Sequence, residues 1–332
     1  MSRKYTNLLP GLVVAAILVS PCVVRAQTAQ IRAKVPASIP AYQPSVTVKG
    51  PIDIPTADEL SDLGEEWSSA FKKVHAEANL VFRSQLTRDA IKSFVNGTSP
   101  LVLAAREMSP EETQAFQAKF AYMPMRIPVC LDANIVFVNK NNPISSISIE
   151  QLDAIYSKSR LGGAKAPALV WGDLGLKGEW AKLPINAYAR AEGTATRASF
   201  ADKAMLKGEF RTGIIDRPDP SALAEAVMTD QAGIAFGTMA SWYFANKVIP
   251  VVPYHGEDAR FPSQEAVTTS KYPMPRLFYA YLNRAPGQPL PPAINEVIHF
   301  LLTQDGQNAV ADSGLLPGPP EFIAIALRRL SR

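Results

Sequence analysis

The feature that most constrains the fold is an alternation of short apolar runs with amphipathic segments along the chain. Residues 46–50, 79–84, 100–108 and 133–144 read as strands, because each is short and is followed by a polar or glycine-containing turn. Residues 56–75 place leucine, tryptophan and phenylalanine at helical spacing. This alternation favours an α/β protein over an all-α or all-β one.

Length and composition predict more than one lobe. The chain has 332 residues, of which 47% are hydrophobic and 19% are charged. That is ample for a sizeable core and too long for one simple domain. Two lobes of roughly 100–150 residues each are therefore expected.

Local signals mark where helices begin and break. Thr56 is followed by Glu59, and Ser148 is followed by Gln151, which is the spacing of a capping box in both cases. A long amphipathic region near the C-terminus is expected to break at Gly306. We therefore expect helices to begin after Thr56 and Ser148.

The first residues have the pattern of a secretory signal peptide. Arg3 and Lys4 precede an apolar run over 8–19, and small residues lead to a cleavage site after Ala26. The apolar run is shorter than the ~18–20 residues that a membrane-spanning helix needs. The signal looks bacterial, so we expect a periplasmic protein, with residues 27–45 as a flexible lead-in rich in Ala, Pro and Gln.

Charge and cysteine content exclude several classes of function. Loss of Arg3, Lys4 and Arg25 with the signal takes the net charge from +4 to +1 (4 − 3), which gives no indication of nucleic-acid binding. Cys130 is then the one remaining cysteine, so no internal disulfide can form, and its apolar surroundings predict a small buried side chain. The histidines lack metal-ligand spacing, so neither a metal nor a cofactor is expected.

One stretch, "RAEGTATR", has residues suited to holding an anion at a helix start. Arg190 ends a predicted strand, Gly193 permits a turn, and Thr194 and Thr196 offer hydroxyl groups at the start of the next helix. Unpaired amides and the helix dipole at such a start attract anions, and arginine adds a forked cationic donor. Glu192 is close enough to brace the arginine. An ordinary helix start capped by Thr194 fits the same residues.

The same stretch resembles a family motif. Its sequence from Arg190 to Phe200 is similar to Arg-x-Asp/Glu-Gly-Ser-Gly-Thr-x-x-x-Phe in the phosphate-binding proteins of bacterial ABC phosphate transporters. Further segments resemble that family in the same order, and the match covers roughly residues 45–320: "GTSPLVLAAREMSPEE", "ANIVFVNKNNPISSISIEQLDAIYS", "VWGDLG", "AGIAFG", "YPMPRLFYAYLN" and "FLLTQDGQNAVADSGLLPGPP".

The resemblance implies a fold and its division. The fold is α/β, a two-lobed periplasmic-binding-protein-like fold of type II, in which each lobe is a mixed sheet flanked by helices and the ligand cleft lies between the lobes. On this chain the first lobe is expected over 46–128 and 271–332, and the second over 129–270. The resemblance also implies that crossing strands join the two lobes.

The resemblance also implies the contacts of the second lobe with an anion. The residues that match them are Arg190, Thr194, Ala195 and Thr196. Glu192 matches the acid that braces the arginine, and Gly193 supports the turn. Ala195 keeps an amide donor where the family has glycine, but its methyl group adds bulk to the turn.

The first lobe departs from the family pattern. Pro51 removes a backbone donor from its first loop, and Ala104 stands in the third loop, where the family has serine or aspartate. That aspartate would accept the proton of hydrogen phosphate, so its absence bears on phosphate selectivity. The remaining candidates for ligand contact in this lobe are Thr56, Ser84, Thr87 and Ala105.

These observations leave two hypotheses about function. The first is an exported, monomeric protein that captures inorganic phosphate or a similar small oxyanion between its lobes, for uptake by an ABC permease or for sensing. The second is a diverged envelope interaction protein on the same scaffold, without tight anion binding. An enzyme is not expected, because the sequence has neither a Gly-x-Ser-x-Gly elbow nor a P-loop. The first hypothesis requires the guanidinium of Arg190 and the amides after Gly193 to be available to a ligand.

Other conspicuous residues have ordinary structural interpretations. Trp67 and Phe71 lie on the apolar face of a predicted helix and are expected in the core. Trp242 and Tyr243 are expected to pack rather than to bind ligand. The amphipathic, basic C-terminal segment 321–332 is expected to dock on its own lobe rather than on a membrane.

Overall fold

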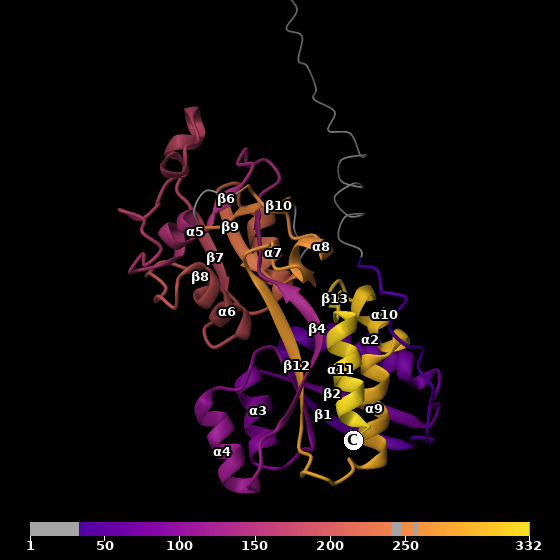
Figure 1. The fold of residues 1–332 in the computed structure, drawn as a ribbon. Helices are drawn as coiled ribbons and strands as arrows, with labels where there is room; N and C mark the ends of the chain where they lie inside the picture. Colours follow the sequence, from indigo (N-terminus) through magenta and orange to yellow (C-terminus); the bar gives the residue numbers. More distant parts are fainter. Residues whose placement is uncertain (1–32, 241–246, 255–257, 332) are drawn as a thin grey trace, which may run out of the picture.

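The computed structural model describes residues 33–240, 247–254 and 258–331 and places them in two lobes. Each lobe is a sheet flanked by helices, and two long strands run between the lobes (Figure 1). This is the predicted α/β architecture. The expected signal peptide, together with Trp242 and Tyr243, lies outside the described residues.

Lobe 1 is built on a sheet of six strands in the order β13-β4-β12-β3-β1-β2. Strand β1 pairs in parallel with β2 and β3, whereas β12 runs antiparallel to both β3 and β4. The strands are β1 (Gly50–Ala57), β2 (Ala78–Gln85), β3 (Leu101–Ala104), β4 (Met125–Ala133), β12 (Pro275–Leu282) and β13 (Leu316–Pro317).

Lobe 2 is built on a sheet of five strands in the order β10-β5-β9-β7-β8, with a separate short pair β11-β6. Its strands are β5 (Ile135–Val138), β6 (Ile147–Ser148), β7 (Asn186–Arg190), β8 (Ile215–Arg217), β9 (Gly233–Gly237), β10 (Lys247–Ile249) and β11 (Val251–Val252). The chain passes from β4 almost directly into β5 and returns through β12. The predicted boundary between residues 128 and 129 lies inside β4, and we propose moving it to Asn134, where the chain leaves the first sheet.

Helices cover both sheets. In lobe 1 they are the 3-10 turn η1 (Asp58–Leu60), α2 (Ser61–Lys72), α3 (Thr87–Val95), α4 (Pro110–Phe120), α9 (Pro292–Leu302), α10 (Gln304–Asp312) and α11 (Pro320–Leu330). In lobe 2 they are α5 (Ile149–Tyr156), η2 (Trp171–Leu174), η3 (Gly178–Lys182), α6 (Ala195–Ala204), α7 (Pro220–Thr229) and α8 (Gln264–Thr268). No helix of the described residues reaches the length and apolarity that spanning a bilayer demands.

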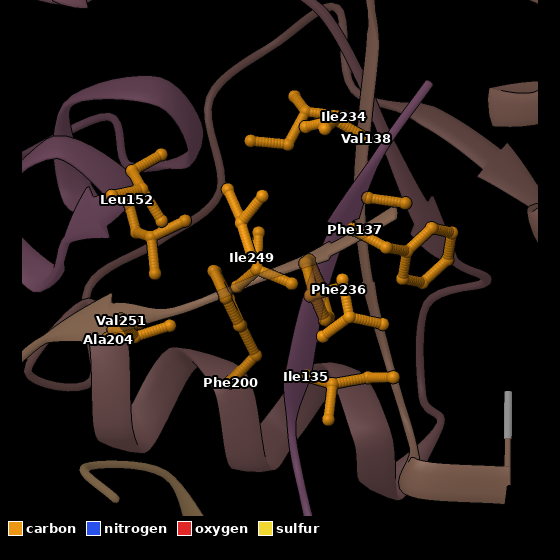
Figure 2. Close-up of a cluster of buried hydrophobic side chains, with 14 of the residues drawn as sticks. Ile135, Phe137, Val138, Leu152, Phe200, Ala204, Ile234, Phe236, Ile249 and Val251 are labelled. Carbon is orange, nitrogen blue, oxygen red and sulfur yellow. The ribbon is translucent and has the colours of Figure 1, made fainter. Parts of the chain in front are cut away.

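Each lobe has its own apolar core. In lobe 2, Phe200 of α6 stacks on Phe236 of β9 with ring centroids 3.7 Å apart, and aliphatic side chains from β5 and β10 surround the pair (Figure 2). In lobe 1, Trp67 and Phe71 of α2 are completely buried, as predicted, and so is Cys130 on β4. Close packing within each core holds the strands and helices of that lobe together.

The predicted helix boundaries are partly correct. Ser148 and Gln151 form the expected capping box at the start of α5. The capping box predicted at Thr56 and Glu59 is wrong, because β1 continues to Ala57 and the Thr56 hydroxyl donates to the backbone oxygen two residues earlier. The break expected at Gly306 lies at Thr303, between α9 and α10.

Residues 33–48, which we call the N-terminal strap, pack against the protein instead of forming the flexible lead-in that composition predicted up to residue 45. Tyr42 donates to Glu296 of α9 at 2.6 Å and contacts His75 at 2.7 Å. Near the start of the strap, Lys34 exchanges two backbone hydrogen bonds with the amide of Gln264 on α8, each 2.9 Å long. The strap therefore touches both lobes.

The C-terminal helix α11 docks on lobe 1, as predicted. Ile323, Ala326 and Leu330 are buried against that lobe's core, and the helix contacts α9 and β4. Its two arginines at the C-terminal end stay exposed. The amphipathic pattern is thus explained by packing within the chain.

Candidate functional site

The start of α6 has the local structure that its sequence predicts. Thr194 is the N-cap: its Oγ1 accepts from the amide of Arg197 at 3.4 Å and donates to the backbone oxygen of Ala191 at 2.9 Å. Gly193, just before it, has φ +86°, a conformation that favours glycine. Ala195 is buried and packs with apolar residues of lobe 1. The first turn of α6 therefore faces the other lobe.

Arg190, at the end of β7, points across the interface. Its side chain is 5% exposed, and its Nη2 lies 2.8 Å from Oδ2 of Asp58, the first residue of η1 in lobe 1. Glu192, expected from the resemblance to brace the arginine, is exposed and makes no ion pair within the described residues. The acid that holds Arg190 thus comes from the opposite lobe.

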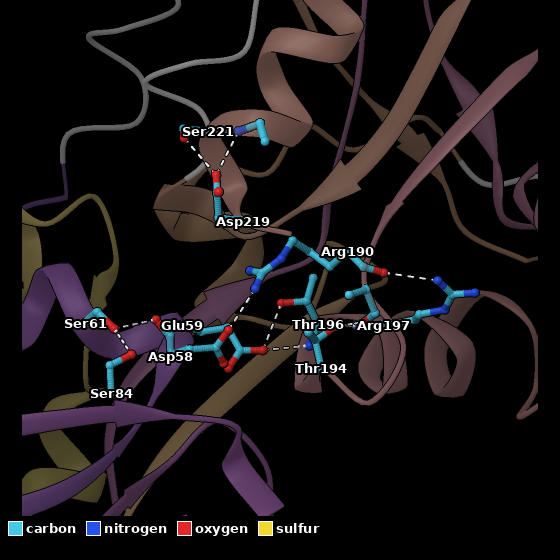
Figure 3. A network of polar contacts seen from close by, with 12 residues as sticks. Asp58, Glu59, Ser61, Ser84, Arg190, Thr194, Thr196, Arg197, Asp219 and Ser221 are labelled. Carbon is cyan, nitrogen blue, oxygen red and sulfur yellow. Dashed lines mark hydrogen bonds and ion pairs between the residues drawn. The ribbon is translucent and has the colours of Figure 1, made fainter. Parts of the chain in front are cut away.

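The amide and hydroxyl of Thr196 are also engaged by lobe 1. The backbone N–H donates to Oε1 of Glu59 at 2.9 Å, and the Thr196 hydroxyl donates to the same oxygen at 3.1 Å (Figure 3). A carboxylate at a helix N-terminus satisfies unpaired amides and interacts favourably with the helix dipole. Glu59 therefore lies where the resemblance places the oxyanion.

A buried ion pair lies beneath this contact, on the two crossing strands. Arg276 of β12 faces Asp132 of β4 as its cross-strand partner, with Nη1 3.3 Å from Oδ2. The same Nη1 lies 3.2 Å from the Thr196 hydroxyl oxygen, and Nη2 donates to the backbone oxygen of Ala105 at 3.3 Å. Asp132 also accepts from the amide of Met239 at 2.8 Å. Arg276 therefore connects both lobes to the strands between them.

The site carries an excess of negative charge. Three carboxylates, those of Asp58, Glu59 and Asp132, face the two guanidinium groups of Arg190 and Arg276. Burial and the nearby Glu59 carboxylate raise the pKa of Asp58 to about 6, against the opposing effect of Arg190. Burial likewise raises the pKa of Asp132 to about 6. Burial also opposes ionisation of Glu59, but Arg276 and the hydrogen bonds that Glu59 accepts hold its pKa below the ordinary value.

The other residues predicted to bind ligand from lobe 1 do not form a common donor set. Ser84 is exposed and accepts a hydrogen bond from the Ser61 hydroxyl at 2.7 Å. Thr87 is buried at the start of α3, and its hydroxyl has no hydrogen-bond partner. The backbone oxygen of Ala105 accepts a hydrogen bond from Arg276. The hydroxyl of Thr56 is used within its own strand.

The residues that matter most at this interface were missed in the sequence. Asp58 and Glu59 follow β1 directly, and sites in α/β proteins form beyond the carboxyl ends of parallel strands. That rule points to the two acids, but the capping-box spacing suggested a local role for Glu59. Arg276 and Asp132 lie within apolar strand segments, where only knowledge of their pairing connects them.

A cavity of about 590 Å³ opens beside the network. Its walls come from both lobes and include Ala195 and Ser199 of α6, Arg276 and Leu277 of β12, and Ala105 of lobe 1. It reaches the first turn of α6 next to Thr196. The donors at the helix start are therefore close to a space that a small molecule or a peptide side chain can enter.

Family comparison agrees with this fold. A model described as the PBP superfamily domain matches residues 41–305. The phosphate-binding protein PstS of Pseudomonas aeruginosa is 30% identical over 293 residues, which are 88% of this chain and 91% of that protein. The protein SphX of Synechococcus elongatus is 26% identical, over 82% of this chain and 80% of its own.

Solved structures show the same architecture. A putative phosphate ABC transporter substrate-binding protein from Clostridium perfringens, with bound phosphate, has a TM-score of 0.66 at 20% identity, over 81% of this chain and 100% of its own. An ABC-type phosphate transport receptor from Vibrio cholerae has a TM-score of 0.62 at 17% identity, over 80% of this chain and 100% of its own. These likenesses extend to the two-lobed fold.

Proposed function

Since this chain belongs to the phosphate-binding protein family of the PBP superfamily, a family of solute-binding proteins, we propose that it has kept the scaffold and replaced the captured anion with its own carboxylates. In this proposal it is an exported envelope protein whose lobes are closed by Asp58 and Glu59. It does not hold phosphate tightly at neutral pH. Its function lies in the closed surface that it presents to a partner, for which an ABC permease is the first candidate.

One observation carries the proposal. The two groups expected to hold an anion, the Arg190 guanidinium and the Thr196 amide, each hold a carboxylate of lobe 1. Phosphate would have to displace both acids or add its charge to three carboxylates already facing two guanidiniums. Like charges at these distances repel strongly in a buried site.

Export is proposed from the basic and apolar leader that ends at Ala26. In the periplasm the mature chain would meet both inorganic phosphate and the transport machinery of the inner membrane. A solute-binding protein whose lobes are closed by its own carboxylates would present its closed surface to a permease while carrying no solute. Such a protein suits a regulatory or structural role.

A second candidate function is capture of phosphate or a similar oxyanion, with the acids moving aside. It is favoured by the donors at the start of α6, which match the family motif, and by the names of the relatives. In that case Arg190 and Thr196 bind the anion, and the carboxylates compete with it.

Calorimetry of the mature protein with inorganic phosphate at pH 7.5 separates the two candidates. Self-closure predicts no binding with a dissociation constant below about 1 mM. Micromolar binding that is lost in Arg190→Ala, and kept in the control Arg88→Ala, would establish phosphate capture instead. Arg88 is a suitable control because it is exposed, lies beside Gly193 and does not contact the two acids.

A further inference from the structure

We propose that the face of lobe 2 toward the interface is a receptor for paired carboxylates, and that Asp58 and Glu59 are its tethered occupant. This inference rests on the proposed self-closure, and it names the class of ligand that would take the place of Asp58 and Glu59. The ligand class is a molecule or protein segment that carries two neighbouring carboxylates.

The geometry assigns one set of donors to each carboxylate. The guanidinium of Arg190 holds Asp58 at 2.8 Å, and the amide and hydroxyl of Thr196 hold Glu59 at 2.9 and 3.1 Å. The two acids are consecutive residues of one turn, so the receptor accepts carboxylates at the spacing of an acidic dipeptide. We therefore use the two carboxylates that Arg190 and Thr196 hold as a guide to the class of ligand that this face of lobe 2 binds.

The tether leaves part of the binding capacity unused. Nε of Arg190 is buried and has no hydrogen-bond partner among the described residues, although a guanidinium can bind a carboxylate through two parallel bonds. No hydrogen-bond donor of the described residues reaches Oδ1 of Asp58 or Oε2 of Glu59, which are also buried. A free ligand, which the backbone of η1 does not constrain, can turn to use both nitrogens of the fork.

The same site is poorly suited to phosphate. A tetrahedral dianion needs donors on several sides, but the turn of lobe 1 that faces Arg190 and Thr196 presents two carboxylates to them. Planar carboxylates match the donors of Arg190 and Thr196 with fewer contacts. The cavity of about 590 Å³ is lined by Ala195, which lies in the same first turn of α6 as Thr196.

Emptying the site tests the inference. In Asp58→Ala/Glu59→Ala the donors of lobe 2 lose their tethered occupant. Thermal shift and calorimetry at pH 7.5 would use four probes: succinate, the blocked peptide Ala-Asp-Glu-Ala, its amide counterpart Ala-Asn-Gln-Ala, and inorganic phosphate. Glu65→Ala/Glu66→Ala is the matched control, because it removes two consecutive acids that are exposed on α2.

We expect the emptied variant to bind succinate or the acidic peptide about tenfold or more tightly than phosphate, and the amide peptide not at all. A further Arg190→Gln change should abolish that binding, and the control pair should behave as the wild type. Preference for the peptide identifies a protein segment as the source of the carboxylates, and preference for succinate identifies a small metabolite.

Two results would overturn the inference. One is equal or tighter binding of phosphate by the emptied variant, and the other is no binding of any carboxylate probe. Should the alanine pair fail to fold, as judged by circular dichroism, Asp58→Asn/Glu59→Gln replaces it with the same expected preference. Failure here leaves self-closure intact, since that is tested by phosphate binding to the wild type.

Discussion

The two lobes present opposite chemistry where η1 meets the start of α6. There lobe 2 offers donors, from Arg190 and Thr196, and lobe 1 offers the carboxylates of Asp58 and Glu59, while the guanidinium of Arg276 on β12 donates to the Thr196 hydroxyl beneath them. An anion gripped between two lobes needs donors from both. Complementary faces instead satisfy each other, as the carboxylates of Asp58 and Glu59 do with Arg190 and Thr196.

The largest effect on stability is expected from the ion pair of Arg276 and Asp132, which lies beneath the interface. Arg276→Met leaves Asp132 buried without its ion-pair partner and also removes the donor to Ala105. We expect a loss of about 3–5 kcal/mol in the free energy of unfolding, measured by urea denaturation. Arg126→Met breaks an exposed pair with Glu107 and should cost at most about 1 kcal/mol. Similar losses in both variants would contradict the role assigned to the buried pair.

The next largest effect should come from the donor side of the interface. Arg190→Ala removes the partner of Asp58, and we expect the free energy of unfolding to fall by about 2 kcal/mol. The cost of burying Asp58 without its partner is partly avoided, because the lobes can separate and let water reach the acid. Small-angle scattering should show a larger radius of gyration than for the wild type. An unchanged radius with full stability would mean that the two faces do not hold the lobes together.

The pH dependence of stability tests the carboxylates of lobe 1, with a smaller expected effect. The pKa of Asp58 is about 6 in the folded chain against an ordinary 3.8, so the folded state binds the extra proton and stability rises as pH falls from 7.5 to 5. The raised pKa of Asp132 acts in the same direction. His299, whose pKa is lowered by burial, opposes them below 6.5.

Asp58→Asn isolates the contribution of that one acid. The variant should show a weaker rise of melting temperature toward acid pH than the wild type, with a difference on the order of a few degrees. Glu59 does not contribute in this window, because its pKa is lowered and it stays ionised. Identical pH profiles for wild type and variant would rule out a shifted Asp58.

The smallest expected effect separates the two donors of Thr196. Thr196→Val keeps the amide bond to Glu59 but removes the hydroxyl, which donates to Glu59 and accepts from Arg276, and the free energy of unfolding should fall by about 1 kcal/mol. Thr196→Ser keeps both donors and should be close to the wild type in chemical denaturation. A loss in the serine variant as large as in the valine variant would point to packing of the methyl group instead.

Much of the scaffold was predictable because its signals are local. The N-cap at Thr194, the capping box at Ser148 and the buried face of α2 follow from side chains within one or two helical turns. The family motif located the donor face of the site for the same reason. Trp67 and Phe71 could be placed in the core from periodicity alone.

The acceptor face could not be predicted in this way. Glu59 has a spacing that suits a local capping box, and its actual partner, Thr196, is 137 residues away. The pairing of Asp132 with Arg276 depends on the register of two antiparallel strands that are far apart in sequence. The strap was misjudged because its composition resembles a linker, whereas Tyr42 has a buried acid to bond with on α9.

The strap also bears on how the molecule can move. β4 and β12 run side by side and can act as one axis for rotation of the lobes, and the strap adds a further link, from Gln264 of lobe 2 to Glu296 of lobe 1. Movement of the lobes about these strands would either break the two hydrogen bonds at Lys34 or carry the strap along with α8, so residues 33–48 form a segment through which that movement can be restrained.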